Sequence, residues 1–131
     1  MTFLDFQRGV RVWMRKVFSK KTTENQRERA YRFLEEALEL FQSLDMEQGE
    51  AHELVRYVFG RPKGEPFQEV GGVMITLAAL CNATDIIMEL AGEAELSRVN
   101  DPEVIAKIMA KRATRAVPGD YKGEPDASDN A

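Results

Sequence analysis

Hydrophobic side chains recur at intervals of three or four residues over most of the chain, an interval that places them on one face of an α-helix. The first stripe predicts a helix over residues 3–18 and consists of Phe3, Phe6, Val10, Trp13, Met14 and Val17. The second predicts a helix over about residues 23–44 and consists of Ala30, Phe33, Leu34, Ala37, Leu38, Phe41 and Leu44. A third helix passes through Leu54 and Val58, and residues 60–64, rich in Gly and Pro, are expected to end it.

Polar residues mark where these helices are expected to begin. Thr2 is followed three residues later by Asp5, a spacing that resembles the capping box of a helix N-terminus. The same spacing recurs twice, in Thr23 with Gln26 and in Asp45 with Gln48. We therefore expect the second and third helices to start at those two positions.

The second half of the chain contains the most apolar helix. Pro66 suits its first position, and from Val70 onward it is apolar all round, so we expect it to form the buried centre of the fold. Residues 82–85 interrupt it, a fifth helix is expected over about residues 86–99, and residues 100–103 start a sixth that ends near residue 115. No segment shows strand alternation. The predicted class is therefore all-α, a helical bundle of about five to six helices.

Length and composition agree with one soluble domain. The 131 residues are 44% hydrophobic and 31% charged, which fits a single domain over residues 1–115. Residues 116–131 have few large apolar side chains and are expected to be a disordered tail. The longest apolar run, over residues 70–81, is shorter than the roughly 20 residues that span a bilayer. With no recognisable leader peptide and a lone Cys81, interpreted as a small core residue, we expect a cytoplasmic protein without membrane contact.

Charge is unevenly distributed along the chain. Residues 1–32 hold nine Lys or Arg against three Asp or Glu, whereas residues 33–60 hold seven acids against one Arg. Two interpretations stay open: solvated helix faces of opposite sign, or an acidic metal site beside a basic surface that attracts phosphates. The overall net charge of −4 makes nucleic acid an unfavoured partner.

Glu35, Glu36 and Glu39 lie together on the second expected helix, within an arc of about 100°. Glu35 and Glu39 form a like-charge pair at i,i+4, which a divalent cation such as Mg²⁺ would compensate, because Mg²⁺ prefers carboxylate oxygens. The alternative interpretation is a plain solvated face opposite the apolar stripe. The helix alone favours that alternative.

The start of the apolar helix carries a second acidic position. Glu69 lies in its first turn, where the helix dipole favours a carboxylate, and needs a partner if that edge is buried. Gly71 and Gly72 follow it, and two glycines in a helix indicate close approach by a neighbouring helix or a ligand, the former being favoured. Thr76 adds a hydroxyl on nearly the same face as Glu69.

The ordered pair Glu35-Glu36-x-x-Glu39 and Glu69-Val70-Gly71-Gly72 resembles the EExxE and ExxD motifs of the MazG-like all-α nucleotide pyrophosphohydrolases. More narrowly, RFLEEALEL followed by FGRPKGEPFQEVGGVMITLAALC is similar to the phage and bacterial branch described as dATP/dGTP diphosphohydrolases. The likeness covers about residues 8–100. One departure is that Gly72 occupies the position of the family's last Asp, so that one metal ligand is missing.

The resemblance implies hydrolysis of a nucleoside triphosphate, a purine dNTP such as dGTP or dATP, to monophosphate and pyrophosphate with Mg²⁺ or Mn²⁺. By the same resemblance Glu36, Glu39 and Glu69 would bind the metal, and Glu35 would orient the attacking water or act as general base. It also implies a homodimer or homotetramer in the cytoplasm of a bacterium or of a phage-infected cell.

Basic side chains are expected to complete the phosphate site. Arg98 falls near the family's cationic position in the helix after ExxD, and Arg61 and Lys63 lie in the loop before Glu69. Thr76 or water would fill the place of the missing Asp. Two other functions stay open: a catalytically inactive helical binding or assembly module, and a small nucleic-acid-associated protein that uses the basic first helix.

Overall fold

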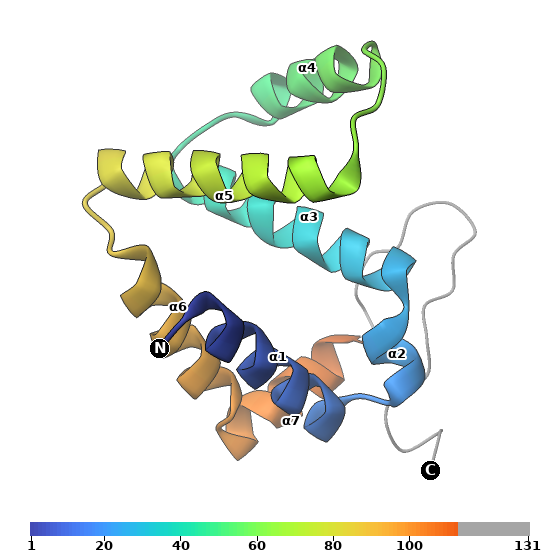
Figure 1. Cartoon of the computed structure of the whole chain (residues 1–131), viewed down its shortest axis with the longest axis vertical. Helices are drawn as coiled ribbons and strands as arrows, with labels where there is room; N and C mark the ends of the chain where they lie inside the picture. The colour runs from blue at the N-terminus through green and yellow to red at the C-terminus, as the bar shows by residue number, and fades with distance from the viewer. Residues whose placement is uncertain (113–131) are drawn as a thin grey trace. The chain divides into compact units, whose positions relative to one another are not determined.

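The computed structural model describes residues 1–112, and over this range the chain forms helices and no strand (Figure 1). The helices are α1 (Phe3–Val17), α2 (Lys20–Glu24), α3 (Gln26–Ser43), α4 (Gln48–Phe59), α5 (Pro66–Ala83), α6 (Met88–Val99) and α7 (Pro102–Arg112). The all-α prediction is confirmed. The expected tail over residues 116–131 and the expected helix end near residue 115 lie outside the described residues.

The chain divides into two compact units. Among the described residues, unit 1 comprises Met1–Phe33 and residues 89–112, and unit 2 comprises Leu34–Met88. The division falls within α3, after its first eight residues.

The core of unit 1 forms where α1 meets α7. Met14, Val17 and Phe18 are buried, and Val10, Trp13, Ile105, Ile108 and Met109 pack against them. The stripe of α1 thus faces α7, as its spacing predicts, and Figure 1 shows the two helices close together. The capping box at Thr2 is confirmed, because the Asp5 amide donates to Thr2 Oγ1 at 3.0 Å and the Thr2 amide donates to Asp5 Oδ2 at 3.1 Å.

The prediction that one helix starts at Thr23 is wrong, because two polar side chains cap two separate helices. Ser19 Oγ accepts from the amide of Thr22 at 3.0 Å and starts α2. Asn25 then takes an extended backbone conformation, and its Oδ1 accepts from the amide of Glu28 at 2.8 Å. Asn and Ser compete with the helix for backbone partners in this way, and the chain therefore restarts at Gln26 as α3.

The expected helix start at Asp45 is also wrong. Asp45 has a φ of 62° and stands just after α3, where a residue in the left-handed region reverses the chain out of the helix. The Met46 amide then donates to the carbonyl of Phe41 at 3.4 Å. The third long helix starts instead after Glu47, whose amide donates to Glu50 Oε2 at 2.8 Å.

Helix α5 is not buried as its composition predicts. Cys81 is its one buried residue, in agreement with the core role expected for that cysteine, while Phe67 is 88% and Ile75 73% exposed. Within unit 2 no atom lies within 4 Å of a Cβ added at Gly71 or Gly72, so no helix of that unit approaches them as closely as expected. An all-apolar sequence indicates that the surface of a helix is favoured to be buried. It does not identify the element or molecule that buries it.

No single helix in the part of the chain that the structure describes is long and apolar enough to cross a membrane. Pro66–Ala83 and Met88–Val99 taken as a pair do pass that test, by length and composition only.

Candidate functional site

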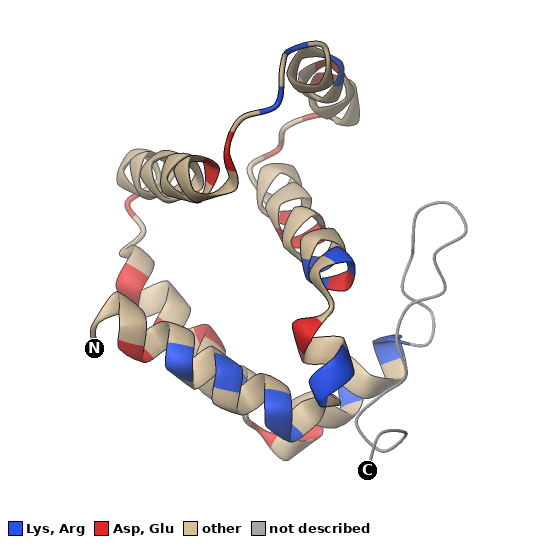
Figure 2. Cartoon of the chain, turned by 45° about the vertical axis from the view of Figure 1, so that its right-hand side comes forward, with Lys and Arg blue, Asp and Glu red and all other residues tan. Residues whose placement is uncertain are grey.

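The three glutamates of the first motif all lie on the part of α3 that belongs to unit 2. Glu35 is half-buried, and Glu36 and Glu39 are exposed. Glu36 and Glu39 are three residues apart on the helix, so their side chains are neighbours on one face. Figure 2 shows acidic residues along α3 and basic residues along α1, as the charge distribution of the sequence predicts.

Glu69 lies in the first turn of α5, within the same unit. Glu65 caps this helix by accepting from the amide of Gln68 at 3.3 Å, and Pro66 is its first residue, as predicted. The Glu69 carboxylate folds back onto the preceding loop, where Oε1 would lie 2.5 Å from a Cβ added at Gly64. This carboxylate is therefore packed directly over the backbone of Gly64.

Two candidate phosphate ligands lie in the loop that leads to Glu69. Gly60 ends α4, its amide donating to the carbonyl of Arg56 at 3.0 Å. The Arg61 guanidinium then lies 5.0 Å from the centre of the Tyr57 ring, a cation–π contact that holds the start of the loop against α4. Lys63 is exposed next to Gly64. Unit 2 thus has two cations within the segment that ends at Glu69.

Thr76 uses its hydroxyl proton within its own helix. Its Oγ1 donates to the carbonyl of Gly72 at 3.0 Å, and the carbonyl of Val73 lies 3.2 Å away. The oxygen lone pairs remain as acceptors. Thr76 therefore offers an oxygen one turn after Gly72, the position where the family motif has Asp.

Arg98 lies in unit 1, not in the unit that carries the glutamates. Its Nε donates to both carboxylate oxygens of Glu95, each at 3.0 Å. This hydrogen bonding, more than the positive charge of Arg98, holds the pKa of Glu95 below its ordinary value of 4.5. The guanidinium of Arg98 is thus engaged by a carboxylate of its own helix.

The donor set of unit 2 suits a hard divalent cation in its chemistry. Glu36, Glu39 and Glu69 offer only carboxylate oxygens, which Mg²⁺ prefers over nitrogen and sulfur. Within residues 1–112 of a single chain, no three His, Cys, Asp or Glu side chains gather closely enough to hold a metal ion. Mg²⁺ is commonly held by one or two carboxylates together with water and substrate phosphates, so the donors fit an ion that arrives with a nucleotide.

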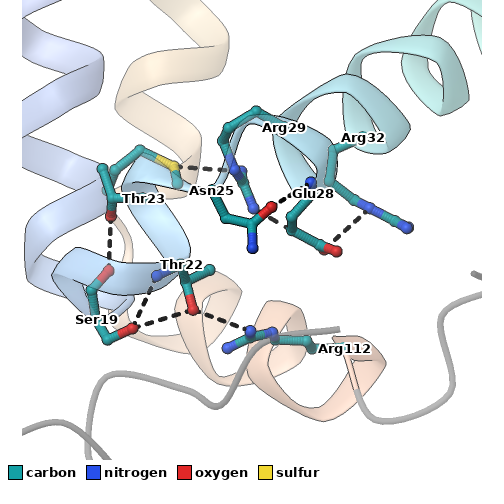
Figure 3. Close-up of polar contacts among 9 residues, drawn as sticks. Ser19, Thr22, Thr23, Asn25, Glu28, Arg29, Arg32 and Arg112 are labelled. Carbon is teal, nitrogen blue, oxygen red and sulfur yellow. Dashed lines mark hydrogen bonds and ion pairs between the residues drawn. The ribbon is translucent and has the colours of Figure 1, made fainter. Parts of the chain in front are cut away.

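A second polar cluster, in unit 1, was not anticipated from the sequence (Figure 3). Glu28 is 3% exposed, and its Oε1 lies 3.2 Å from Arg32 Nε and 3.9 Å from Arg29 Nη2. Nearby, Arg112 donates to Oγ1 of the fully buried Thr22 at 3.2 Å. In the sequence, the i,i+4 spacing of Glu28 and Arg32 could have indicated their ion pair. Glu28 pairs with two arginines of its own helix, and the Arg112–Thr22 hydrogen bond connects α7 to α2, so we interpret the cluster as a structural connection between α2, α3 and α7.

Comparison with known proteins adds no relative, since no family model, no curated protein and no solved structure matches the chain. The function is therefore argued from the residues themselves.

Proposed function

We propose that the chain is a Mg²⁺-dependent nucleoside triphosphate pyrophosphohydrolase, acting on a purine dNTP such as dGTP or dATP. The observation that carries this proposal is the packing of the Glu69 carboxylate over Gly64, in a loop whose sequence also contains Arg61 and Lys63. A carboxylate able to hold a cation and two cations able to bind phosphate oxygens thus lie within one short segment of the sequence. A metal-bound triphosphate requires both kinds of group.

The roles follow from the chemistry of the side chains. Glu36, Glu39 and Glu69 would hold the metal, which supplies charge neutralisation of the triphosphate and a lowered pKa for bound water. Glu35 accepts the proton of the attacking water, whose oxygen forms a bond to the α-phosphorus. The bond from that phosphorus to the bridging oxygen breaks, and pyrophosphate leaves with the electron pair. Arg61 and Lys63 bind the β- and γ-phosphates and so stabilise the leaving group.

Gly72 affects the number of metal ions. A motif of the ExxD kind provides a carboxylate at this position, whereas here the next oxygen further along the helix face is the Thr76 hydroxyl. A neutral hydroxyl is a weaker ligand for Mg²⁺ than a carboxylate. We therefore propose fewer metal ions per active site than in proteins with the complete motif, with Thr76 binding a water or the substrate.

The uncovered surface of unit 2 supports a homo-oligomer. Large apolar side chains are exposed along both α4 and α5, namely Leu54, Val55, Val58, Phe59, Phe67, Val70, Val73, Met74 and Ile75. Exposed apolar surface of this kind marks interaction sites, and soluble oligomers are mostly symmetric assemblies of identical chains. Gly71 and Gly72 leave open space in which a helix of a second copy can approach closely. We propose a homodimer or homotetramer in which the α5 helices meet.

Product analysis tests the enzymatic proposal. The protein is incubated with each of the eight common NTPs and dNTPs in Mg²⁺ or Mn²⁺, alongside Glu36→Gln and the matched variant Glu53→Gln, which changes an exposed glutamate of α4. We expect monophosphate and pyrophosphate from a purine dNTP, lost with Glu36→Gln or EDTA and retained with Glu53→Gln. Equal turnover by both variants would remove Glu36 from the site.

One alternative function has an observation in its favour. The exposed apolar faces of α4 and α5 also fit an inactive binding or assembly module. In such a module, Gly72 in place of the motif's Asp would have abolished metal binding. Absence of turnover with all eight nucleotides, together with a stable oligomer, would favour that module. Nucleic-acid binding through the basic α1 would instead appear as affinity for DNA or RNA that falls steeply with salt.

A further inference from the structure

One side of α1 carries a row of arginines. Arg8, Arg11 and Arg15, called the arginine row below, are all exposed, and at helical spacing they fall within an arc of about 60°. Val10 and Val17, which pack in the core of unit 1, lie on the opposite side of the helix. Figure 2 shows basic residues recurring along α1. The arginine row therefore faces solvent and leaves the core packing of α1 undisturbed.

Little negative charge balances the arginine row. Asp5 is the one acid of α1, and its carboxylate is engaged in the capping box of the helix. Arg15 Nη2 lies 3.8 Å from Glu24 Oε1 of α2, but both side chains are more than half exposed, so water weakens this pair. Members of the row stand three or four residues apart, a spacing at which like charges on a helix repel one another. An anionic partner would relieve that repulsion.

Positive charge is concentrated in unit 1 as a whole. Among the described residues, unit 1 holds thirteen Lys or Arg against eight Asp or Glu, whereas unit 2 holds three against ten. Lys16, Lys20 and Lys21 are exposed and continue the basic surface from the end of α1 into α2. The net charge of −4 of the whole chain thus combines one basic and one acidic unit, and it does not describe the surface of unit 1.

We infer that the arginine row of α1 is a docking surface for the phosphodiester backbone of a nucleic acid. A guanidinium binds a phosphate group through two parallel N–H donors, which an ammonium cannot offer. The row extends about 10 Å along the helix axis, a length that faces about three phosphates of one strand. Contacts to phosphates carry no information about the bases, so binding is independent of sequence. The inference does not depend on the enzymatic proposal.

The apolar stripe of α1 disfavours a membrane surface as the partner. A helix that lies on a membrane inserts its apolar face among the lipid headgroups. In α1 that face is occupied, because Val10, Trp13 and Met14 pack in the core that α1 forms with α7. Leu4 and Val12 are exposed on the side of the arginine row, but two aliphatic side chains make a far smaller apolar face than such a helix uses.

The test is the fluorescence anisotropy of a labelled DNA duplex of roughly 20 base pairs, titrated with the full chain in EDTA at about 50 mM and about 200 mM salt. One variant combines Arg8→Gln with Arg11→Gln, and a second combines Arg8→Lys with Arg11→Lys, which keeps the charge. The matched control, Arg56→Gln with Lys63→Gln, removes the same charge from exposed positions of unit 2.

Three phosphate contacts predict that the affinity of the unmodified chain falls about 40-fold between the two salt concentrations. The glutamine variant of the arginine row should bind more weakly, and its affinity should fall only about fourfold, because one contact remains. The lysine variant and the control should keep most of the salt dependence of the unmodified chain.

Three results would overturn the inference. The first is no binding of the duplex by the unmodified chain at the lower salt concentration. The second is an equal loss in the glutamine variant and in the control, since the position of the charge on α1 would then be irrelevant. The third is binding to vesicles that contain phosphatidylserine without binding to the duplex, which would assign the row to a membrane surface. Because EDTA removes Mg²⁺, each of these results leaves the proposed hydrolase activity to be judged by product analysis alone.

Discussion

Trp13 donates its indole N–H to the backbone carbonyl oxygen of Val99 at 2.8 Å, and this hydrogen bond joins α1 to the last residue of α6. The same ring packs against the buried cluster of Met14, Val17 and Phe18, meeting the Phe18 ring edge-on with the ring centres 5.9 Å apart. Trp13 therefore acts as a core residue with one polar partner, which agrees with its place in the apolar stripe of the first helix.

Replacing Trp13 by Phe should destabilise unit 1. The change keeps an aromatic ring but leaves the partly buried carbonyl of Val99 without its donor, which costs about 1–3 kcal/mol. Urea denaturation followed by circular dichroism measures the loss, with Tyr57→Phe on the exposed face of α4 as the control. A loss no larger than that of the control would show that water replaces the indole.

Glu28→Gln should be more damaging than the same change at an exposed pair. Glu28 is buried and pairs with the partly buried Arg29 and Arg32, and removal of one partner of a buried ion pair costs about 3–5 kcal/mol. Glu95→Gln breaks a pair with Arg98 in which both side chains are more than half exposed, where about 0–1 kcal/mol is expected. Comparison of the two midpoints in urea decides the point, and similar values would mean that water reaches Glu28.

Asp85 offers a position where glycine should stabilise the chain. Its φ of 56° is left-handed, and the Ile86 amide donates to the Cys81 carbonyl at 3.0 Å to close the end of α5. Glycine meets no steric penalty there, so Asp85→Gly should raise the free energy of unfolding by about 1 kcal/mol. Asp85→Ala keeps the left-handed backbone strain, and Ala tolerates this region less well than Asp. The Asp85→Ala change should therefore lower the free energy of unfolding. The opposite signs, measured by thermal unfolding, identify the backbone as the cause.

The capping box of α1 predicts sensitivity to acid. Hydrogen bonds from the backbone and then from the side chain of Thr2 hold the pKa of Asp5 below its ordinary value of 3.8. A carboxyl whose pKa is lower in the folded state stabilises above its unfolded pKa and loses that contribution as pH falls through the folded one. Between pH 5 and pH 2.5, Asp5→Asn should therefore lose less stability than the unmodified chain. Identical acid profiles would contradict the box, and an NMR titration of the Asp5 carboxyl reads the pKa directly.

Gly72→Leu should dissociate the proposed oligomer. Within one chain the position has open space, so the leucine is tolerated there, whereas a helix of a second copy packed against Gly72 would be displaced. Sedimentation velocity should show the unmodified chain as a multimer and Gly72→Leu shifted toward monomer. Gly49→Leu, also in open space, is the control. A monomeric unmodified chain would contradict the assembly itself.

Most of the helical architecture was predictable from the sequence, because periodicity and capping are local signals. The stripe of α1, its capping box at Thr2 and the start of α5 at Pro66 all agree with the structure. The breaks at Asn25 and Asp45 were missed because Asn and Asp suit both ends of a helix, and only the backbone conformation tells which end they occupy. The exposure of α5 was missed because composition does not identify the covering molecule.

The candidate site was predictable as residues but not as contacts. The sequence places Glu36 and Glu39 on one helix, Glu69 in a first turn, and Arg61 and Lys63 in the loop before it, and the structure agrees on each element. The packing of Glu69 over Gly64 could not be predicted, because it depends on how the loop folds back. The pairing of Arg98 with Glu95 in unit 1 could not be predicted either. Arg98 was chosen because it resembles a cationic position of the family, and that resemblance says nothing about its partners in this chain.

Covering of the exposed α5 surface by a second copy, as proposed, would make the stability of unit 2 depend on protein concentration. If a second copy covers Phe67, Val70 and Ile75, folding and association share one free energy, and mass action then raises the melting temperature as protein is added. A cell that dilutes this protein would then hold unit 2 less folded. The abundance of the protein would then determine the fraction of chains in which unit 2 is folded.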